Sequence, residues 1–347
     1  MSLGLYYAPG SYTETSEIIE FADTVAKYHG LVACHLRDES NGSIGLLAAL
    51  HEMLCVARES GVKVEISHIK CAGPSTWGLA DVLVRTIENA RRRGFDIAAD
   101  QYPYVAGCSS VMGALIPRWA QSGSQQDFDN RVKDLACRRK IKDEIARNFC
   151  SGSGPDRLII GRYPPEPEYG GKSFAEISQM TGLDPAEVAL RVVKSFHPQL
   201  ITYSMTEEDL QTIMKAPFVM VGSDGRALCP DGILSSGPPH PRSFGTFPRV
   251  ISRYALYKRA ITIEDAIRKM TSMPAGRLNI KDRGYVKPGF KADIVVFDPG
   301  VIADRATFDS PRLYPAGIEY VVVNGKIVVA EGKHTGAMSG IPLRHGL

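Results

Sequence analysis

The sequence contains no apolar run long enough to cross a membrane. No apolar stretch reaches the roughly 18 residues that a spanning helix needs, and the first residues lack the basic-then-apolar pattern of a signal peptide. The seven cysteines are an odd number, lie far apart and include no Cys-x-x-Cys pair, which argues against a disulfide framework. We therefore expect a cytoplasmic protein with reduced thiols and no membrane partner.

A strong excess of charge of one sign is also missing. The 347 residues carry a net charge of +3, and charged residues make up 23% of the chain. Short basic runs, such as Arg91–Arg93 and Arg138–Lys140, fall in polar, helical stretches, which favours solvated faces over a nucleic-acid footprint. With 44% hydrophobic residues, the composition is that of a globular protein, and we expect a small-molecule partner and no nucleic acid.

Helical and strand-like patterns alternate in the first third of the chain. Glycines end each of the helical patterns, and short runs rich in Val, Ile and Ala follow them. This alternation predicts strand–helix units wound around a parallel sheet. The expected helices are 15–29, 43–60 and 79–93, and the expected strands are LVACH, VKVEISH and FDIAADQYPY.

This alternation stops after about residue 110. The stretch from about 110 to 215 is polar and helix-rich. It is too long for an ordinary connection between two strands, so we expect an inserted lid or subdomain. The tail is β-rich, and Asn324-Gly325 indicates a hairpin turn. The expected parts are 1–109 (first part of the α/β region), 110–215 (the insertion), 216–279 (last core strand and helices) and 280–347 (a C-terminal β-segment).

Three of the apolar stretches end on a residue that can bind a metal. LVACH ends on His35, VEISH on His68 and FVMVGSD on Asp224. In barrels of alternating strands and helices, the active site is built at the C-terminal ends of the strands. Two imidazoles and a carboxylate at such positions are what a metal-dependent hydrolase needs, although each alone has the simpler interpretation of a hydrogen-bonded strand end.

Several motifs together resemble one known family. ACHLRDES, ISHIKCAG, DQYPY, VGSDG and HPRSFGTFPRVISRY are similar to motifs of the D-aminoacylase (N-acyl-D-amino-acid deacylase) family of the amidohydrolase superfamily. The tail RGYVKPGFKADIVVFDP resembles the C-terminal β-segment of that superfamily. The resemblance implies a zinc-dependent hydrolase that cleaves the amide bond of N-acyl-D-amino acids to a carboxylate and a free D-amino acid.

The resemblance also implies roles for single residues. His35 and His68 match the zinc-binding histidines of the fifth and sixth strands, and Asp224 matches the catalytic aspartate that moves a proton from the attacking water to the leaving amine. Arg242, Lys70 and Tyr102 match positions that hold the α-carboxylate of the substrate. A serine after YPY completes that group, and either Cys108 or Ser109 can fill its place; we prefer Ser109.

Simpler interpretations stand beside these roles. Lys70 can be a solvated loop lysine, Arg242 can pair with Asp231, and Tyr102 can be ordinary core packing. His240 fits a loop-structuring residue better than a metal ligand.

The chain also departs from the family pattern. It contains no His-x-His, the pair that supplies two metal ligands on the first barrel strand, and no cysteine at the place of the bridging ligand. Residues 3–18 resemble the segment that follows the fourth strand. The predicted fold is therefore a partial TIM-like (β/α) barrel of strands five to eight, lacking the N-terminal portion.

This departure leaves alternatives open. The chain can be a catalytically inactive truncated fragment or an assembly subunit, and it can associate with itself or with a complementing N-terminal half. A dihydroorotase-like cyclic-amide hydrolase shares the same type of tail, but the HPR and SHIK motifs argue against it.

Overall fold

A computed structural model of the chain describes residues 1–235 and 240–344, which form two compact units. The first unit consists of Met1–Asp100 and Tyr104–Ala216 together with His240. The second consists of Gln101–Pro103 and, among the described residues, 217–235 and 241–344.

A parallel sheet is the framework of the first unit. Its strands are β1 (Ser2–Gly4), β2 (Leu31–His35), β3 (Lys63–Ile66) and β4 (Ile97–Gln101). They lie in the order β1-β2-β3-β4, and each neighbouring pair is parallel. Three consecutive residues of β3 are buried, as expected for a strand covered on both faces. The sequence predicts β2, β3 and β4 but does not predict β1.

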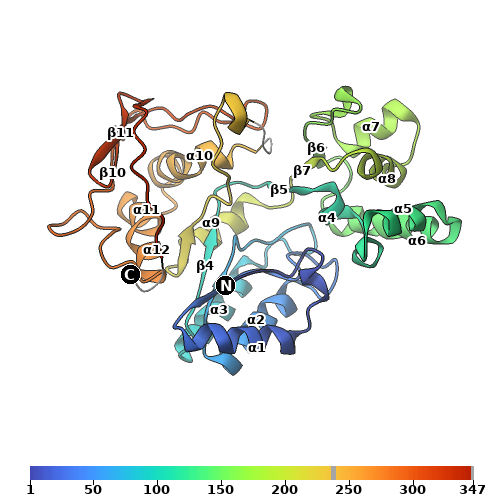
Figure 1. The fold of residues 1–347 in the computed structure, drawn as a ribbon, viewed down its shortest axis with the longest axis horizontal. Coiled ribbons are helices and arrows are strands. Elements are labelled where there is room, and N and C mark those ends of the chain that lie inside the picture. The colour runs from blue at the N-terminus through green and yellow to red at the C-terminus, as the bar shows by residue number, and fades with distance from the viewer. Residues whose placement is uncertain (236–239, 345–347) are drawn as a thin grey trace. The chain divides into compact units, whose positions relative to one another are not determined.

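Three helices connect these strands, and Figure 1 shows them grouped together beside β4. They are α1 (Thr15–Lys27), α2 (Leu46–Ser60) and α3 (Ala80–Arg92), within a few residues of the predicted ranges. A capping box between Glu14 and Glu17 starts α1. Gly61 ends α2 with a left-handed φ of 67°, and its N–H is bonded to the Ala57 carbonyl. The local signals for these helices are therefore confirmed.

The segment predicted as an insertion is helical but also contains a second sheet. Strands β5 (Gly107–Ser110), β6 (Leu158–Ile160) and β7 (Gln199–Thr202) are antiparallel in the order β5-β7-β6. The sequence analysis did not predict this sheet. The helices of the segment are α4 (Val111–Leu115), α5 (Gln125–Lys133), α6 (Leu135–Ser151), α7 (Phe174–Thr181), α8 (Pro185–Ser195) and α9 (Glu207–Lys215).

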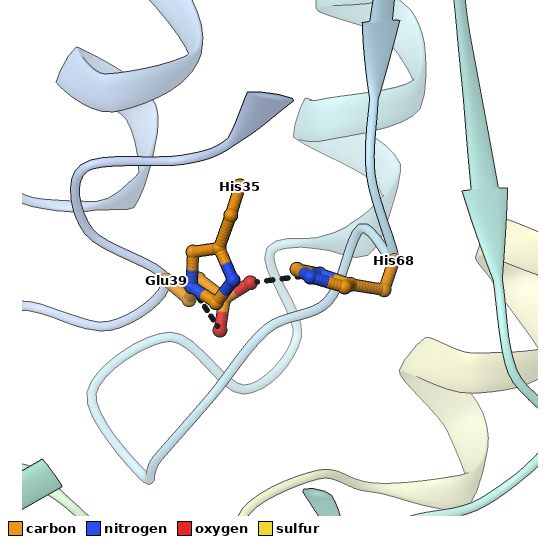
Figure 2. Close-up of side chains that lie close together, drawn as sticks. All are labelled: His35, Glu39 and His68. Atoms are coloured by element: carbon orange, nitrogen blue, oxygen red, sulfur yellow. Dashed lines mark ion pairs between the residues drawn. The ribbon is translucent and has the colours of Figure 1, made fainter. Parts of the chain in front are cut away.

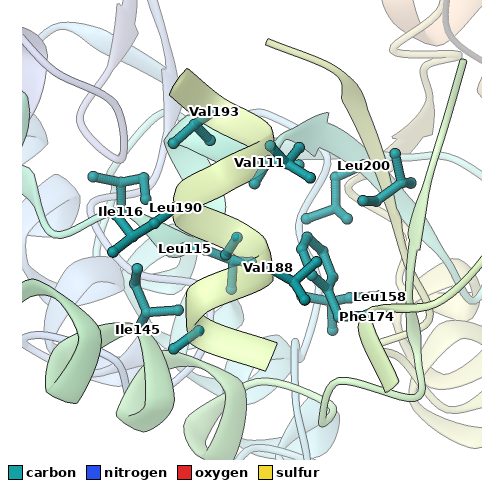
Figure 3. Close-up of a cluster of buried hydrophobic side chains, with 14 of the residues drawn as sticks. Val111, Leu115, Ile116, Ile145, Leu158, Phe174, Val188, Leu190, Val193 and Leu200 are labelled. Carbon is teal, nitrogen blue, oxygen red and sulfur yellow. The ribbon is translucent and has the colours of Figure 1, made fainter. Parts of the chain in front are cut away.

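This segment has a hydrophobic core of its own. Figure 3 shows α8 in the middle of that core, with Val188, Leu190 and Val193 among the buried side chains. Phe174 of α7 and Leu200 of β7 are fully buried in the same cluster. A separate core explains how so long a stretch remains ordered between two strands of the framework.

The second unit begins with β8 (Val219–Val221), whose three residues are buried. The N–H of Gly222, which follows β8, donates to the carbonyl of Gln101, the last residue of β4. The remaining helices of this unit are α10 (Arg242–Arg249), the π-helical segment η5 (Val250–Tyr257), α11 (Ile263–Met270) and α12 (Ser272–Arg277).

The C-terminal part of the second unit is an antiparallel sheet in the order β12-β11-β10-β9. Its strands are β9 (Ile294–Phe297), β10 (Ile318–Val323), β11 (Lys326–Ala330) and β12 (Lys333–His334). Asn324 and Gly325 connect β10 to β11, and both have positive φ angles, 49° and 77°. This is the backbone geometry that an Asn-Gly hairpin turn requires, so the predicted hairpin is confirmed.

The fold is therefore mixed α/β, with one parallel sheet and two antiparallel sheets. The α/β class is confirmed, while the partial barrel and the four expected parts stay predictions. Among the residues the structure describes, no helix is both long and apolar enough to span a bilayer. All seven cysteines are free thiols.

Candidate functional site

His35 and His68 lie close together in the first unit. His35 is the last residue of β2, and His68 follows β3 by two residues. Because β2 and β3 are parallel neighbours with Cys34 opposite Ile66, both strands end at the same edge of the sheet. The two imidazole rings are 4.4 Å apart between centroids. The structure thus brings these two histidines together.

The backbone at His68 is unusual. Its φ angle is 40°, in the left-handed region that residues other than glycine rarely adopt. The His68 N–H donates to the Asp100 carboxylate at 2.9 Å, which helps to hold this conformation. Strained backbone of this kind is common at functional sites, where the surrounding contacts fix the direction of one side chain.

A third residue, Glu39, faces both histidines. Figure 2 shows its carboxylate between the two rings, with one oxygen directed to each. His35 Nε2 is 3.5 Å from Glu39 Oε2, and His68 Nδ1 is 3.2 Å from Glu39 Oε1. One ligand atom from each of the three residues lies within 4.8 Å of the others. His35, Glu39 and His68 therefore form a cluster that we call the His-Glu-His site.

Burial controls the charges of this site. It lowers the pKa of His35 to about 3, against an opposing effect of Glu39, so the ring is neutral near pH 7. Burial alone would raise the pKa of Glu39, but the neighbouring His35 and Lys70 hold that pKa well below its ordinary value. The site thus pairs an ionised carboxylate with a neutral imidazole, the form in which both groups bind metals.

Lys70 completes the surroundings of the His-Glu-His site. Its ammonium pairs with Glu39 Oε1 and lies 2.9 Å from His68 Nδ1. Only 8% of its side chain is exposed. The interpretation of Lys70 as a solvated loop lysine is therefore wrong.

The loop after β2 places Glu39. The Asp38 side chain is buried and accepts hydrogen bonds from the backbone N–H groups of Ser40, Ser43 and Gly45 and from both serine hydroxyls. Burial opposes the ionisation of Asp38, but these donors lower its pKa. Asp38 thus fixes the turn on which the neighbouring Glu39 side chain is presented to the histidines.

Two tyrosines and a serine lie beside His35. The rings of Tyr6 and Tyr7 are 5.3 and 5.0 Å from the His35 ring, between centroids. The Tyr7 hydroxyl is 3.1 Å from Ser109 Oγ, which joins β5 to this edge of the sheet. Cys108, the alternative to Ser109, lies on the same strand with its Sγ 3.6 Å from Gln199 Oε1. Of the two candidates, Ser109 is the one linked to a neighbour of His35.

The remaining predicted site residues belong to the second unit. Asp224 lies three residues beyond β8 with a φ of 47°, again in the left-handed region. Arg242, at the start of α10, pairs with it at 2.7 Å between Nη1 and Oδ2. The Arg242 guanidinium also lies over the Tyr102 ring, 5.1 Å from its centroid. These three residues therefore lie together, whereas their approach to the histidines stays a prediction.

The donor set of the His-Glu-His site suits a divalent metal. Zinc binds imidazole nitrogen and carboxylate oxygen at about 2.0–2.2 Å, so two ligands of one zinc lie no more than about 4.3 Å apart. The two measured carboxylate–imidazole separations fall inside that limit. In addition, His35 Nε2 is buried and has no hydrogen-bond partner among the described residues. A buried ring nitrogen in that state fits a metal ligand.

Comparison with known proteins identifies relatives of the chain. Residues 181–329 match the amidohydrolase family model. An N-acyl-D-glutamate deacylase of Alcaligenes xylosoxydans xylosoxydans is 35% identical over 93% of this chain and 56% of its own length. A D-aminoacylase of the same organism is 34% identical over 98% of this chain and 60% of its own length. Over most of its length the chain is therefore similar to an N-acyl-D-glutamate deacylase and to a D-aminoacylase.

A solved structure supports the same relationship. The N-acyl-D-glutamate deacylase of Bordetella bronchiseptica, complexed with zinc and a phosphonate inhibitor that mimics the tetrahedral intermediate, matches with 32% identity and a TM-score of 0.75. The match covers 96% of this chain and 61% of that structure. The chain spans a little over half the length of the curated relatives that it matches.

Glu39 is the site residue that the sequence analysis missed. The sequence gives no signal for it, because the direction of its side chain depends on the hydrogen bonds that Asp38 makes within the loop. By contrast, His240 was expected to structure its loop, and its buried ring nitrogen is bonded to the Ala106 carbonyl at 2.8 Å. Cys34 and Cys71 are buried, and burial raises the pKa of each thiol to about 12, so neither is a reactive nucleophile.

Proposed function

We propose that this chain is a metal-dependent hydrolase that cleaves the amide bond of N-acyl-D-amino acids, giving a carboxylate and the free D-amino acid. The observation that carries the proposal is the His-Glu-His site at the C-terminal ends of β2 and β3, and the similarity to an N-acyl-D-glutamate deacylase supports it. We propose zinc as the metal, held by His35 and His68 and by Glu39. A bound divalent metal would activate water and polarise the amide carbonyl.

Asp224 is the proposed proton carrier of the reaction. It would take a proton from the attacking water and pass it to the leaving amine, as the resemblance implies. Its ion pair with Arg242 fixes one carboxylate oxygen and leaves the other available for the proton.

Lys70, Tyr102, Ser109 and Arg242 are the proposed contacts of the substrate α-carboxylate. Arg242 carries five N–H donors in a planar fork, so it can pair with Asp224 and still offer donors to a second carboxylate. Its position over the Tyr102 ring restricts the orientation of that fork. Ser109 would add a hydroxyl donor, and its link to Tyr7 fixes the hydroxyl in place.

A direct experiment tests the proposed function. The purified chain is stripped with a chelator, loaded with zinc and incubated with N-acetyl-D- and N-acetyl-L-amino acids, and the release of free amine is measured. We expect release from D-substrates with zinc and none after chelation. Asp224→Asn should remove the activity while zinc remains bound. A folded, zinc-loaded chain that releases no D-amino acid would contradict the proposal.

A further inference from the structure

The Lys70 ammonium lies where a metal ion would have to bind. It contacts two of the three groups of the His-Glu-His site, namely Glu39 Oε1 and His68 Nδ1. It comes from the turn after β3, only two residues beyond His68, and its side chain is 92% buried. The ammonium is thus part of the site itself and does not lie at its rim.

The contact atoms show that this arrangement excludes a metal. An ammonium has three N–H donors and no lone pair, so His68 Nδ1 must accept the hydrogen bond with its lone pair. That lone pair is the one that Nδ1 would donate to a metal, and a ring nitrogen has no second lone pair. Glu39 has further lone pairs, but an ammonium and a divalent cation repel each other strongly in a buried site. His68 Nδ1 therefore cannot bind both cations at the same time.

We propose that Lys70 and a divalent metal ion are alternative occupants of the His-Glu-His site, and that metal entry displaces the Lys70 ammonium. Without metal, Lys70 neutralises the buried carboxylate of Glu39. With metal, the ammonium leaves Glu39 and His68 and is free to pair with an anionic group. This inference rests on the proposed metal site and deepens the proposed function, because it makes the carboxylate-binding lysine available only after the metal has bound.

Zinc affinity in variants of the 347-residue chain tests this competition. Lys70→Met keeps the length and the apolar stem of the side chain but removes the charge. We expect Lys70→Met to bind zinc at least about tenfold more tightly than the unmodified chain, a coupling of ordinary size between two linked events. Zinc affinity is measured by competition with a chromophoric chelator at constant pH and salt.

Lys63→Met is the matched control, because Lys63 is the first residue of β3 and Lys70 follows the other end of that strand. Its zinc affinity should equal that of the unmodified chain. A Lys70→Met variant that folds, judged by circular dichroism, and binds zinc no more tightly than the unmodified chain would overturn the inference.

Chemical labelling gives a second readout that needs no variant. The unmodified chain is treated with an amine-acylating reagent with and without zinc, and the peptide that carries Lys70 is quantified by mass spectrometry. Displacement predicts several-fold faster acylation of Lys70 with zinc, while the Lys63 peptide stays unchanged. Equal or slower acylation of Lys70 with zinc would overturn the inference.

These results also separate the inference from the proposed function. If Lys70→Met binds zinc more tightly but the unmodified, zinc-loaded chain hydrolyses no D-substrate, the inference is supported and the function is contradicted. Hydrolysis by the unmodified chain with no gain in zinc affinity in Lys70→Met supports the function and contradicts the inference.

Discussion

Glu39 supplies the negative charge at a site whose other two ligands are imidazoles. A divalent metal in a buried site needs a compensating anion, because moving its charge out of water is otherwise very unfavourable. Glu39 meets this need, since its pKa is held well below the ordinary value and its two oxygens face two different rings. The carboxylate charge, more than its shape, should therefore decide whether a metal binds.

The charge of Glu39 can be removed with little change in shape. We expect Glu39→Gln to weaken zinc binding by at least about tenfold, because an amide oxygen is a weaker ligand than a carboxylate and carries no charge. Glu59→Gln on the exposed end of α2 is the control and should leave zinc affinity unchanged. Chelator competition measures both. Equal zinc affinity in Glu39→Gln and in the unmodified chain would remove Glu39 from the ligand set.

Lys269 of α11 is a buried amine in the second unit. Its side chain is 1% exposed, and its ammonium donates to the Val219 carbonyl of β8 at 2.8 Å. Burial lowers the pKa of Lys269 to about 8, although Asp265 opposes the shift. The folded chain therefore binds this proton more weakly than the unfolded chain does.

This difference predicts a pH dependence of stability. The unfolded chain keeps the proton up to the ordinary pKa of 10.5, so the contribution of Lys269 to the free energy of unfolding rises between about pH 8 and pH 10.5. The slope is at most about 1.4 kcal/mol per pH unit. Urea unfolding of the unmodified chain and of Lys269→Met across this range isolates the effect. A difference between the two chains that does not change with pH would contradict it.

At the scale of elements, the loop from β2 to α2 determines the geometry of the His-Glu-His site, because it carries Glu39. Asp38 holds it through three backbone donors and two hydroxyls, all within 3.0 Å. Asp38→Ala would leave those backbone N–H groups, which are only partly exposed to water, without their acceptor. We expect the free energy of unfolding to fall by about 2–4 kcal/mol and zinc affinity to fall with it.

Denaturant unfolding and chelator competition measure the two effects of Asp38→Ala. The control is Asp23→Ala on the exposed face of α1, which should change stability by less than about 0.5 kcal/mol. If Asp38→Ala kept full zinc affinity, the loop would have no part in presenting Glu39.

The same loop shows what could be predicted from the sequence and what could not. The short apolar run LVACH has a strong strand pattern, and its last residue is a histidine, so His35 could be placed at the edge of a parallel sheet. His68 could be placed at the same edge, because it ends the apolar run VEISH. Glu39 could not be placed, because its direction depends on the hydrogen bonds that Asp38 makes to residues up to seven positions later. Local patterns give strands and helices, while loop conformation depends on such contacts.

The antiparallel sheet of the inserted segment was missed for a related reason. Ser109 lies in β5, and its partner across the sheet is Leu200 of β7. Four residues of small and polar type, GCSS, give no strand signal of their own. The pairing depends on a distant strand and on the separate hydrophobic core that supports it. Ser109 could thus be chosen from its place after YPY but could not be placed in a strand.

At the scale of the whole molecule, metal binding should raise the free energy of unfolding of the chain. A ligand that binds only the folded chain raises the free energy of unfolding by an amount set by its concentration relative to its dissociation constant. His35 and Glu39 are four residues apart, but His68 lies on the next strand connection, so the three ligands come together only when the first unit is folded. The unfolded chain offers zinc no such group, so binding is coupled to folding.

We therefore expect zinc at 100 times its dissociation constant to stabilise the chain by about 2.7 kcal/mol, seen as a rise in the thermal unfolding midpoint. Magnesium should have a much smaller effect, because it prefers six oxygen ligands and keeps its water. The variant with both His35→Ala and His68→Ala should gain nothing from zinc, and a chelator should reverse the gain in the unmodified chain. Equal stabilisation of this variant would show that zinc binds elsewhere, for instance at one of the seven free thiols, and the His-Glu-His site would lose its assigned role.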